Sequence, residues 1–385
     1  MGENRSIDYY IIATISAFFM IGIAGTRPLI SLMLANQLNT SPWVIGVIVA
    51  LYSFFPLLYA IKMGKWVDKV GSKRPLMFST FFGSIALVIP FYFPTIVGIG
   101  FSQLIAGITQ TILAVAAQSY AGHTKDPKKR EQNVAIFSIG VSIGSLIGPL
   151  IGGPFSDHFG YSHAFLYLGI VGLLSTISTI FLKEKHEENG KKKQSSTGNI
   201  FELLSIVNVR RAFLISSLIL IGKDIFVTYF PLIATNNGIS DTTIGIIIAL
   251  NAGAGILIRW VMPALLDRYG RNHVILGSIL ISGVIFLIIP FFDQLIVLYL
   301  LSLALGMGLG IGQPLSITTT ILSLPEDRVG EGLGLRLTSN RLTQVLGPIL
   351  FGAFANLLGF TSIFLITGAF LILGSNKTRV YVPEK

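Results

Sequence analysis

Apolar stretches of about 20 residues recur along the whole 385-residue chain, and they restrict its fold more than any other feature. Each is long enough to cross roughly 30 Å of hydrocarbon as a helix. Hydrophobic residues make up 52% of the chain and charged residues only 12%, against roughly a quarter charged in ordinary soluble domains. So much apolar surface cannot be buried in one soluble core. The sequence predicts an all-α integral membrane protein and excludes a soluble domain, a disordered chain and a nucleic-acid-binding protein.

Breaks at glycine, proline and charged residues divide this apolar sequence into twelve predicted transmembrane helices. The first is too long for the core of a signal peptide, and no small-residue cleavage site follows it, so we expect it to be a helix of the mature protein. The predicted limits of the twelve are 8–34, 43–62, 75–93, 96–120, 134–153, 162–182, 211–234, 243–262, 273–289, 294–319, 332–356 and 361–376.

Lysine and arginine residues concentrate in alternate connections, which predicts the orientation of the chain. With the N-terminus placed inside, the inner segments hold 24 of the 28 basic residues, Arg328 and Arg336 among them, and the outer loops hold none. We therefore expect a multi-pass protein of the cytoplasmic membrane with both termini cytoplasmic. The net charge of +10 needs no nucleic acid. The remaining four basic residues lie inside predicted spans and are Arg27, Lys223, Arg259 and Arg341.

The two halves of the chain resemble each other at a constant offset of 199 residues. Residues 41–46 match residues 240–245, and at the same offset identical residues follow Ala50, Leu51, Asp68, Gly71, Gly107, Gly148, Pro149 and Gly153. Six helices return the chain to the side where it started, so the repeat predicts two parallel six-helix bundles about an axis normal to the membrane. We expect bundles at 1–182 and 211–385 and a cytoplasmic linker at 183–210. The end of this polar segment, residues 201–209, is apolar enough to lie along the inner membrane surface.

A charged motif stands in the inner loop between the second and third predicted spans. It reads Gly64-Lys-Trp-Val-Asp68-Lys69-Val-Gly71-Ser-Lys73-Arg74, and the second half carries a degraded copy, Pro263-Ala-Leu-Leu-Asp267-Arg268-Tyr-Gly270-Arg271. The spacing resembles the G-x-x-x-D-R/K-x-G-x-R/K-R/K signature of the major facilitator superfamily. Together with twelve spans, duplicated halves and a long middle loop, the resemblance covers the whole chain. It implies the major facilitator fold, in which one monomer suffices.

The residues of this motif suit an inner gate. Gly71 permits a backbone turn that a side chain would obstruct. Asp68, at the inner end of a helix, can accept hydrogen bonds from the free N–H groups that begin a neighbouring helix. The resemblance implies that this neighbour is the eleventh helix, expected to begin near Gly332, and that the contact latches the gate. Asp267 would make the equivalent contact at the start of the fifth helix, near Asn133.

Small residues predict close helix packing in the fifth span and at Gly64. The fifth span carries glycines four residues apart on one helix face, with a proline that removes an amide donor: Gly140, Gly144, Gly148, Pro149, Gly152 and Gly153. The pattern resembles the G-x-x-x-G-P-x-x-G-G motif of the drug:proton antiporter branch of the superfamily, and a plain packing face is the alternative. The fourth span departs from proton-coupled members, because Gln103 stands where they carry an arginine. Any proton coupling must therefore use other groups.

Ionisable residues inside the spans are candidate functional groups, because they are costly in a bilayer. Asp224 is the one acid, about 13 residues into the seventh predicted span and beside Lys223. It could be a switchable proton site or the partner of Arg27 or Arg341 in a structural ion pair. Arg341 lies too deep to snorkel, Arg27 could do so, and for Arg259 snorkelling is the favoured interpretation.

The resemblance implies that the helices carrying these charges border a central cavity. With more cations than acids, a positive lining argues against a purely cationic substrate and for an anionic, zwitterionic or neutral amphipathic one. Polar residues on facing helices could orient the solute, namely Gln110, Gln118, Asn251 and Gln313.

Other chemistries find no support in the sequence. There is no phosphate-binding loop, no metalloprotease motif and no cysteine, so we expect no cofactor, no metal site and no enzyme activity. Asp157, His158 and His163 are expected in a solvated outer loop rather than at a metal site.

These features predict a secondary active transporter that moves a small molecule by alternating access, most simply efflux in exchange for protons. The main alternative is proton-linked or facilitated uptake of an anionic or zwitterionic metabolite. The duplicated gate motifs argue against a receptor that transports nothing and against an intramembrane enzyme.

Overall fold

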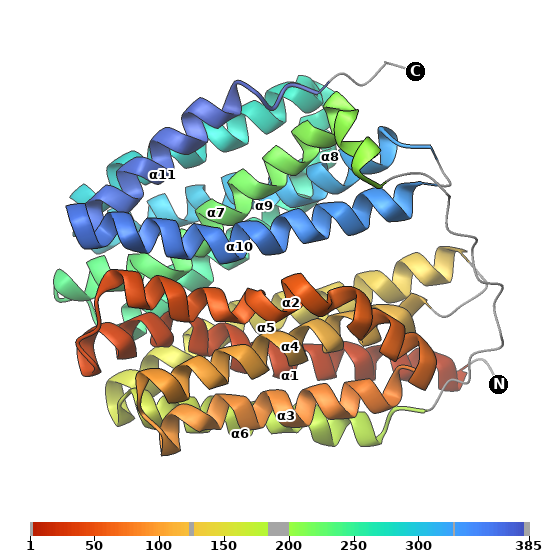
Figure 1. Ribbon diagram of the computed structural model, residues 1–385, viewed down its shortest axis with the longest axis horizontal. Helices are drawn as coiled ribbons and strands as arrows, with labels where there is room; N and C mark the ends of the chain where they lie inside the picture. The colour runs from red at the N-terminus through yellow and green to blue at the C-terminus, as the bar shows by residue number, and fades with distance from the viewer. Residues whose placement is uncertain (1–2, 123–126, 184–199, 326–327, 381–385) are drawn as a thin grey trace. The chain divides into compact units, whose positions relative to one another are not determined.

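The computed structural model describes residues 3–122, 127–183, 200–325 and 328–380, and these are almost wholly helical (Figure 1). Ten helices are long and apolar enough to cross a membrane, and one apolar helix is shorter. No strand occurs in this part of the chain. The prediction of an all-α membrane protein is confirmed.

The helices follow the predicted spans closely. The first half contains α1 (Glu3–Leu32) with a π-helical end (Met33–Gln37), α2 (Pro42–Val70), α3 (Lys73–Tyr92), α4 (Ile96–Gly122), α5 (Pro127–Phe159) and α6 (Tyr161–Ile180). The second half contains the 3-10 helix η2 (Ile200–Ser205), α7 (Val207–Asn236), α8 (Asp241–Ile288), the 3-10 turn η3 (Ile289–Phe291), α9 (Leu295–Leu322), α10 (Val329–Leu358) and α11 (Phe360–Ser375).

Helix α8 accounts for two of the predicted spans. Its 48 residues would extend roughly 72 Å as a straight helix, more than twice the hydrocarbon thickness. Gly270 interrupts it with a φ of 73° and a ψ of 155°, which no helix accommodates. The eighth and ninth spans therefore meet at Gly270, and the described chain supplies all twelve.

The chain divides into two compact units. Unit 1 consists of residues 1–190 and 238–249, and unit 2 of residues 191–237 and 250–385. In unit 1, α1 packs against α5 and α6. In unit 2, α7 packs against α10 and α11, the helices that the repeat pairs with α5 and α6. The equivalent first helix of each unit, α1 or α7, therefore packs against the equivalent pair of helices. The bundle limits at 182 and 211 stay a prediction.

The repeat is visible in the backbone at the turns. In the part of the chain that the structure describes, six residues have positive φ, a conformation that costs most side chains roughly 1 kcal/mol or more. They form three pairs at the offset of 199 residues: Asn39 (49°) with Gly238 (75°), Gly71 (82°) with Gly270 (73°), and Gly160 (79°) with Gly359 (82°). The turn expected at Gly71 is confirmed, and each such turn occurs once in each half.

Helix crossings repeat in the same way. A Cβ atom added to Gly107 on α4 would lie 1.8 Å from the carbonyl oxygen of Tyr52 on α2. One added to Gly306 on α9 would lie 2.1 Å from the carbonyl oxygen of Asn251 on α8. Both residues of the second pair follow those of the first by 199 positions. The two crossings therefore depend on glycine at equivalent places.

The glycines of α5 pack against α1 inside unit 1. Cβ atoms added to Gly140, Gly144 and Gly152 would lie 2.2, 2.5 and 2.6 Å from backbone oxygens of α1, and one added to Gly148 would lie 2.6 Å from the amide nitrogen of Gly25. The structure thus gives this motif the role of a packing face within the unit. Gly64 differs, because no atom lies within 4 Å of its added Cβ. The prediction of close approach at Gly64 is wrong.

The segment expected along the inner membrane surface instead packs into unit 2. Leu203 of η2 is 1% exposed and belongs to a small core with Val209, Ala212, Phe213 and Leu324. The apolar residues Leu203, Leu204, Ile206 and Val209 are therefore explained by contacts with protein.

A matched pair of substitutions tests the glycine face of α5. Gly148→Ala should destabilise the protein by about 1–3 kcal/mol, because the new methyl group meets the backbone of α1. At the repeat-related position, Gly347→Ala should be neutral or slightly stabilising, because the added Cβ meets one atom at 3.9 Å and alanine favours a helix. Thermal unfolding of the purified protein in detergent measures both. Equal destabilisation by the two variants would show that the space at Gly148 is unimportant.

Candidate transport site

The charged motif of the first half spans a helix end and the following turn. Asp68 and Lys69 lie in the last turn of α2, and Lys73 and Arg74 begin α3. The turn between them is closed by the amide of Gly71, which donates to the carbonyl oxygen of Val67 at 2.9 Å. The motif therefore presents its charged groups at the end of a rigid helical hairpin.

The acids of the two motif copies are exposed. Asp68 and Asp267 make no hydrogen bond or ion pair with the residues that the structure describes. Arg268 lies with its guanidinium 5.4 Å from the ring centre of Tyr269. The expected start of the fifth helix near Asn133 is wrong, because α5 begins at Pro127 and Asn133 is buried inside it. The latch role of the two acids stays a prediction.

Unit 1 contributes one cation and one amide from the predicted site. Arg27 on α1 lies with its guanidinium 4.9 Å from the ring centre of Tyr52, a cation–π arrangement inside the protein. Gln110 on α4 has a buried Oε1 atom that accepts no hydrogen bond in the described chain. An amide oxygen left without a donor there is costly unless a ligand or water supplies one.

Unit 2 contributes the acid. Asp224 is 7% exposed near the middle of α7, and the neighbouring Lys223 is exposed. Arg341 on α10 is half-buried and donates from Nη1 to Oε1 of Gln344 at 3.2 Å, one turn farther along the same helix. The burial of Asp224 makes it the carboxyl group placed deepest within a transmembrane helix of this unit.

Two of the predicted site residues donate hydrogen bonds to backbone carbonyl oxygens. Pro314 removes the N–H that would bond to the carbonyl oxygen of Gly310, and Arg259 donates to that oxygen from Nε at 3.3 Å. Asn251 donates from Nδ2 to the carbonyl oxygen of Ser302 at 3.1 Å. A free carbonyl is costly in a bilayer, so the first contact explains Arg259 without a substrate. The second gives the buried amide of Asn251 a hydrogen-bond acceptor within the protein.

A buried polar network in unit 2 contains the predicted residue Gln313 and a cation that sequence reasoning placed elsewhere. Arg336 is 3% exposed and donates from Nε to Ser316 Oγ at 2.8 Å. Its Nη2 donates to the side-chain and backbone oxygens of Gln313. The hydroxyl of Ser216 lies 2.6 Å from Asn340 Oδ1, and Ser316 donates to the carbonyl oxygen of Ala212 at 2.6 Å. We call these six residues, from α7, α9 and α10, the Arg336 network.

The assignment of Arg336 to an inner segment is wrong. Helix α10 begins at Val329, so Arg336 lies two turns inside it. A signal was present in the sequence, because Arg336, Asn340 and Gln344 recur every four residues and share one helix face.

Asp157 also lies in a different place from the one predicted. Helix α5 runs to Phe159, so Asp157 lies in its last turn and not in a solvated loop. Its carboxylate accepts from the amides of Asp241 and Thr242 at 3.0 and 2.8 Å, capping the start of α8 inside unit 1. Ser156 donates to Asp241 Oδ2 at 2.6 Å. Among the described residues, no group of three metal-binding side chains occurs here or elsewhere.

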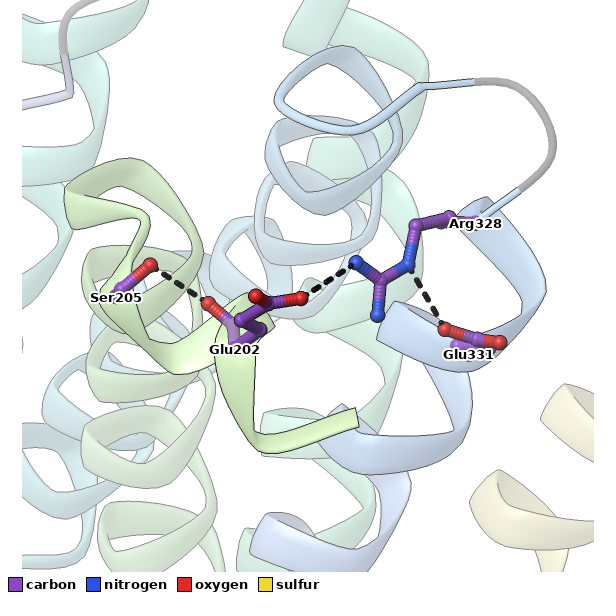
Figure 2. Close-up of polar contacts among 4 residues, drawn as sticks. All are labelled: Glu202, Ser205, Arg328 and Glu331. Carbon is purple, nitrogen blue, oxygen red and sulfur yellow. Dashed lines mark hydrogen bonds and ion pairs between the residues drawn. The ribbon is translucent and has the colours of Figure 1, made fainter. Parts of the chain in front are cut away.

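Figure 2 shows how the segment before α7 is tied to the start of α10. Arg328 donates from Nε to Glu331 at 3.1 Å and from Nη1 to Glu202 of η2 at 3.4 Å. Ser205 donates to the carbonyl oxygen of Glu202 at 2.7 Å. The hydrogen bond with Glu331 raises the pKa of Arg328 above its ordinary value, so this cation stays charged. The positive charge at the start of α10 is thereby compensated locally.

Comparison with known proteins decides the family. The sequence profile of the Major Facilitator Superfamily matches residues 12–222 and 212–376. The chain belongs to the major facilitator superfamily. A protein of this superfamily is a transporter, not an enzyme, and the multi-pass helices place it in a membrane.

Relatives within the superfamily cover nearly the whole chain. An uncharacterized MFS-type transporter of Methanocaldococcus jannaschii is 26% identical over 363 residues, 92% of each chain. Multidrug resistance protein 2 of Bacillus subtilis is 22% identical and covers 100% of this chain and 97% of its own.

Solved structures show the same fold. A bacterial homologue of the human lysosomal transporter Spinster, in an inward-facing and occupied conformation, has a TM-score of 0.81 at 13% identity and covers 97% of this chain and 96% of its own. A variant of the nucleoside transporter NupG has a TM-score of 0.82 at 16% identity and covers 96% and 98%. The major facilitator fold expected from the motifs is confirmed.

A double-mutant cycle in this transporter tests the role of Arg259. Arg259→Leu should destabilise the wild-type protein by about 1 kcal/mol, because the carbonyl oxygen of Gly310 loses its donor. In a Pro314→Ala background the restored N–H serves that oxygen, and the same change should cost less, with a coupling of about 0.5 kcal/mol or more. Thermal unfolding of the four proteins gives the coupling. Additive effects would mean that Arg259 does not act through this carbonyl.

Proposed function

We propose that this protein is a secondary active transporter that exports a small molecule in exchange for protons by alternating access. The observation that carries the proposal is the buried carboxyl group of Asp224, near the middle of α7. An ionisable group at such a depth is costly and is retained for a function such as proton transfer. Asp241, the other buried acid in the described chain, sits at a helix start and accepts from Ser156.

The direction of transport is supported by the relatives. Two Bacillus subtilis proteins that match along at least nine-tenths of this chain are named multidrug resistance proteins, at 22% and 23% identity. Efflux of small molecules is the function those names describe. The Gly148-Pro149 motif is similar to that of the antiporter branch, and in this structure it packs α5 against α1.

A second candidate, uptake of an anionic or zwitterionic metabolite, is favoured by a different observation. Arg336 is a buried cation in addition to the predicted Arg27 and Arg341. Accumulation of solute inside whole cells, rather than loss from them, would distinguish uptake from efflux.

Proton coupling can be tested with the collapse of an imposed pH gradient in inverted membrane vesicles. We expect one panel among cationic, neutral and anionic solutes to trigger proton movement in the wild type. Asp224→Asn should abolish this response, because the amide cannot bind and release a proton. Asp293→Asn, which changes an exposed acid between η3 and α9, should keep it.

Two results would contradict the proposal in different ways. Unchanged coupling in Asp224→Asn would remove Asp224 from the mechanism and leave antiport standing. Solute flux without proton movement, in a vesicle with no gradient, would indicate a facilitator and reduce Asp224 to a structural group.

A further inference from the structure

The guanidinium of Arg336 is buried without a carboxylate partner among the residues that the structure describes. Its hydrogen-bond acceptors are the hydroxyl of Ser316 and two oxygens of Gln313, and all three are neutral. Glu331, the one acid of α10, bonds to Arg328 instead. A buried charge is normally paired, because neutral dipoles do not fully replace the solvation it loses. Within the part of the chain that the structure describes, the positive charge of the Arg336 network therefore has no compensating carboxylate.

The fold itself does not require this network. The six positions that precede its members by 199 residues are apolar in unit 1. Phe137 and Ala117, the counterparts of Arg336 and Ser316, belong to the hydrophobic core of unit 1, and Val141, the counterpart of Asn340, packs against it. The remaining counterparts are Ala13, Ala17 and Ala114. The same helix arrangement thus closes over apolar side chains in one half, so the polar version in unit 2 serves something other than packing.

The geometry of the network suits an anion. Arg336 donates through Nε and Nη2, and its Nη1 makes no hydrogen bond to a described residue. The two N–H groups of Nη1 are therefore the donors left for a ligand, and a charge-assisted hydrogen bond from them to a carboxylate oxygen is stronger than one to a neutral oxygen. Amide groups of Gln313 and Asn340 belong to the same network and can supply further polar contacts.

We propose that Arg336 binds the carboxylate of the transported molecule inside unit 2. The inference rests on the proposed transport function, and it names the substrate class: an organic molecule with a carboxylate, anionic or zwitterionic. It does not depend on the direction of transport or on proton coupling. Arg336, Gln313 and Asn340 are then binding residues, and the bound carboxylate compensates the buried charge.

Ligand-induced thermal stabilisation of the full chain in detergent tests this directly. The probes are acetate, benzoate and octanoate, each compared with its neutral amide at constant ionic strength. In the wild type we expect at least one carboxylate to bind roughly tenfold or more tightly than its amide, because charge-assisted hydrogen bonds are lost in the amide. Arg336→Gln should abolish that preference.

Matched variants separate binding from folding. Arg328→Gln removes an arginine from the start of the same helix, where Glu331 compensates it, and should keep the carboxylate preference. Arg336→Met should unfold within a few degrees of the wild type without ligand, because the equivalent position of unit 1 is the apolar Phe137, and it should show no preference. Arg336→Lys keeps the charge but removes the N–H groups of Nη1, so we expect a weakened preference.

The outcomes are distinct from those of the proton assay. No carboxylate preference in the wild type would overturn the inference without any variant, and so would an equal preference in Arg336→Gln. Folding lost in both the Gln and Met variants would show that the network is structural, which also contradicts it. An Arg336-dependent preference together with absent proton movement would uphold the carboxylate site and refute antiport alone.

Discussion

Close contact between helix backbones is the constraint on which the rest of this structure depends. In a bilayer there is no hydrophobic force to bring helices together, so association relies on dense packing and hydrogen bonds. The α2–α4 and α8–α9 crossings each leave no room for a methyl group at Gly107 and Gly306. Because both crossings recur at one offset along the sequence, the repeat is preserved where the geometry tolerates no side chain. Elsewhere the halves have been free to diverge.

Several polar side chains in the transmembrane helices of this protein donate hydrogen bonds to backbone carbonyl oxygens. Arg259 bonds to the carbonyl oxygen that Pro314 leaves free, Asn251 bonds to Ser302, and the hydroxyl of Tyr229 donates to the carbonyl oxygen of Pro348 at 2.9 Å. Each such contact replaces solvation that the membrane does not provide. A polar residue in a span is thus not by itself a substrate ligand. Arg336 differs from the exposed Arg259, because Arg336 is 3% exposed and all three of its hydrogen-bond acceptors are neutral.

The sequence predicts the helices and turns of this protein better than its site. Apolar length and glycine position depend on local sequence, so the spans and the turn at Gly71 follow from the residues alone. The burial of Arg336 was missed because the residue was counted with the inner segment on account of its charge, although it lies inside the predicted span 332–356. Its hydrogen-bond partners, Gln313 and Ser316, precede it by 23 and 20 residues on another helix, so local sequence does not reveal them. The capping role of Asp157 was missed for a similar reason, since its partners lie 84 and 85 residues away at the start of α8. The error at Gly64 was the opposite one, because the sequence predicted a close helix contact there that the structure does not contain.

The two halves differ in how the equivalent helix pairs α1–α5 and α7–α10 are packed. Where α5 carries Gly140, Gly144 and Gly152 against α1, the equivalent positions of α10 are Ser339, Thr343 and Phe351. The hydroxyl of Thr343 lies 2.9 Å from Ser217 Oγ on α7, so hydroxyl contacts replace backbone contacts in that pair. The same pair of helices carries the Arg336 network on positions that are apolar in unit 1. In unit 1 this helix pair is packed through glycine against backbone, and in unit 2 the equivalent pair carries hydroxyl, amide and guanidinium groups. Because the apolar version packs without such groups, packing alone does not account for the polar residues of unit 2.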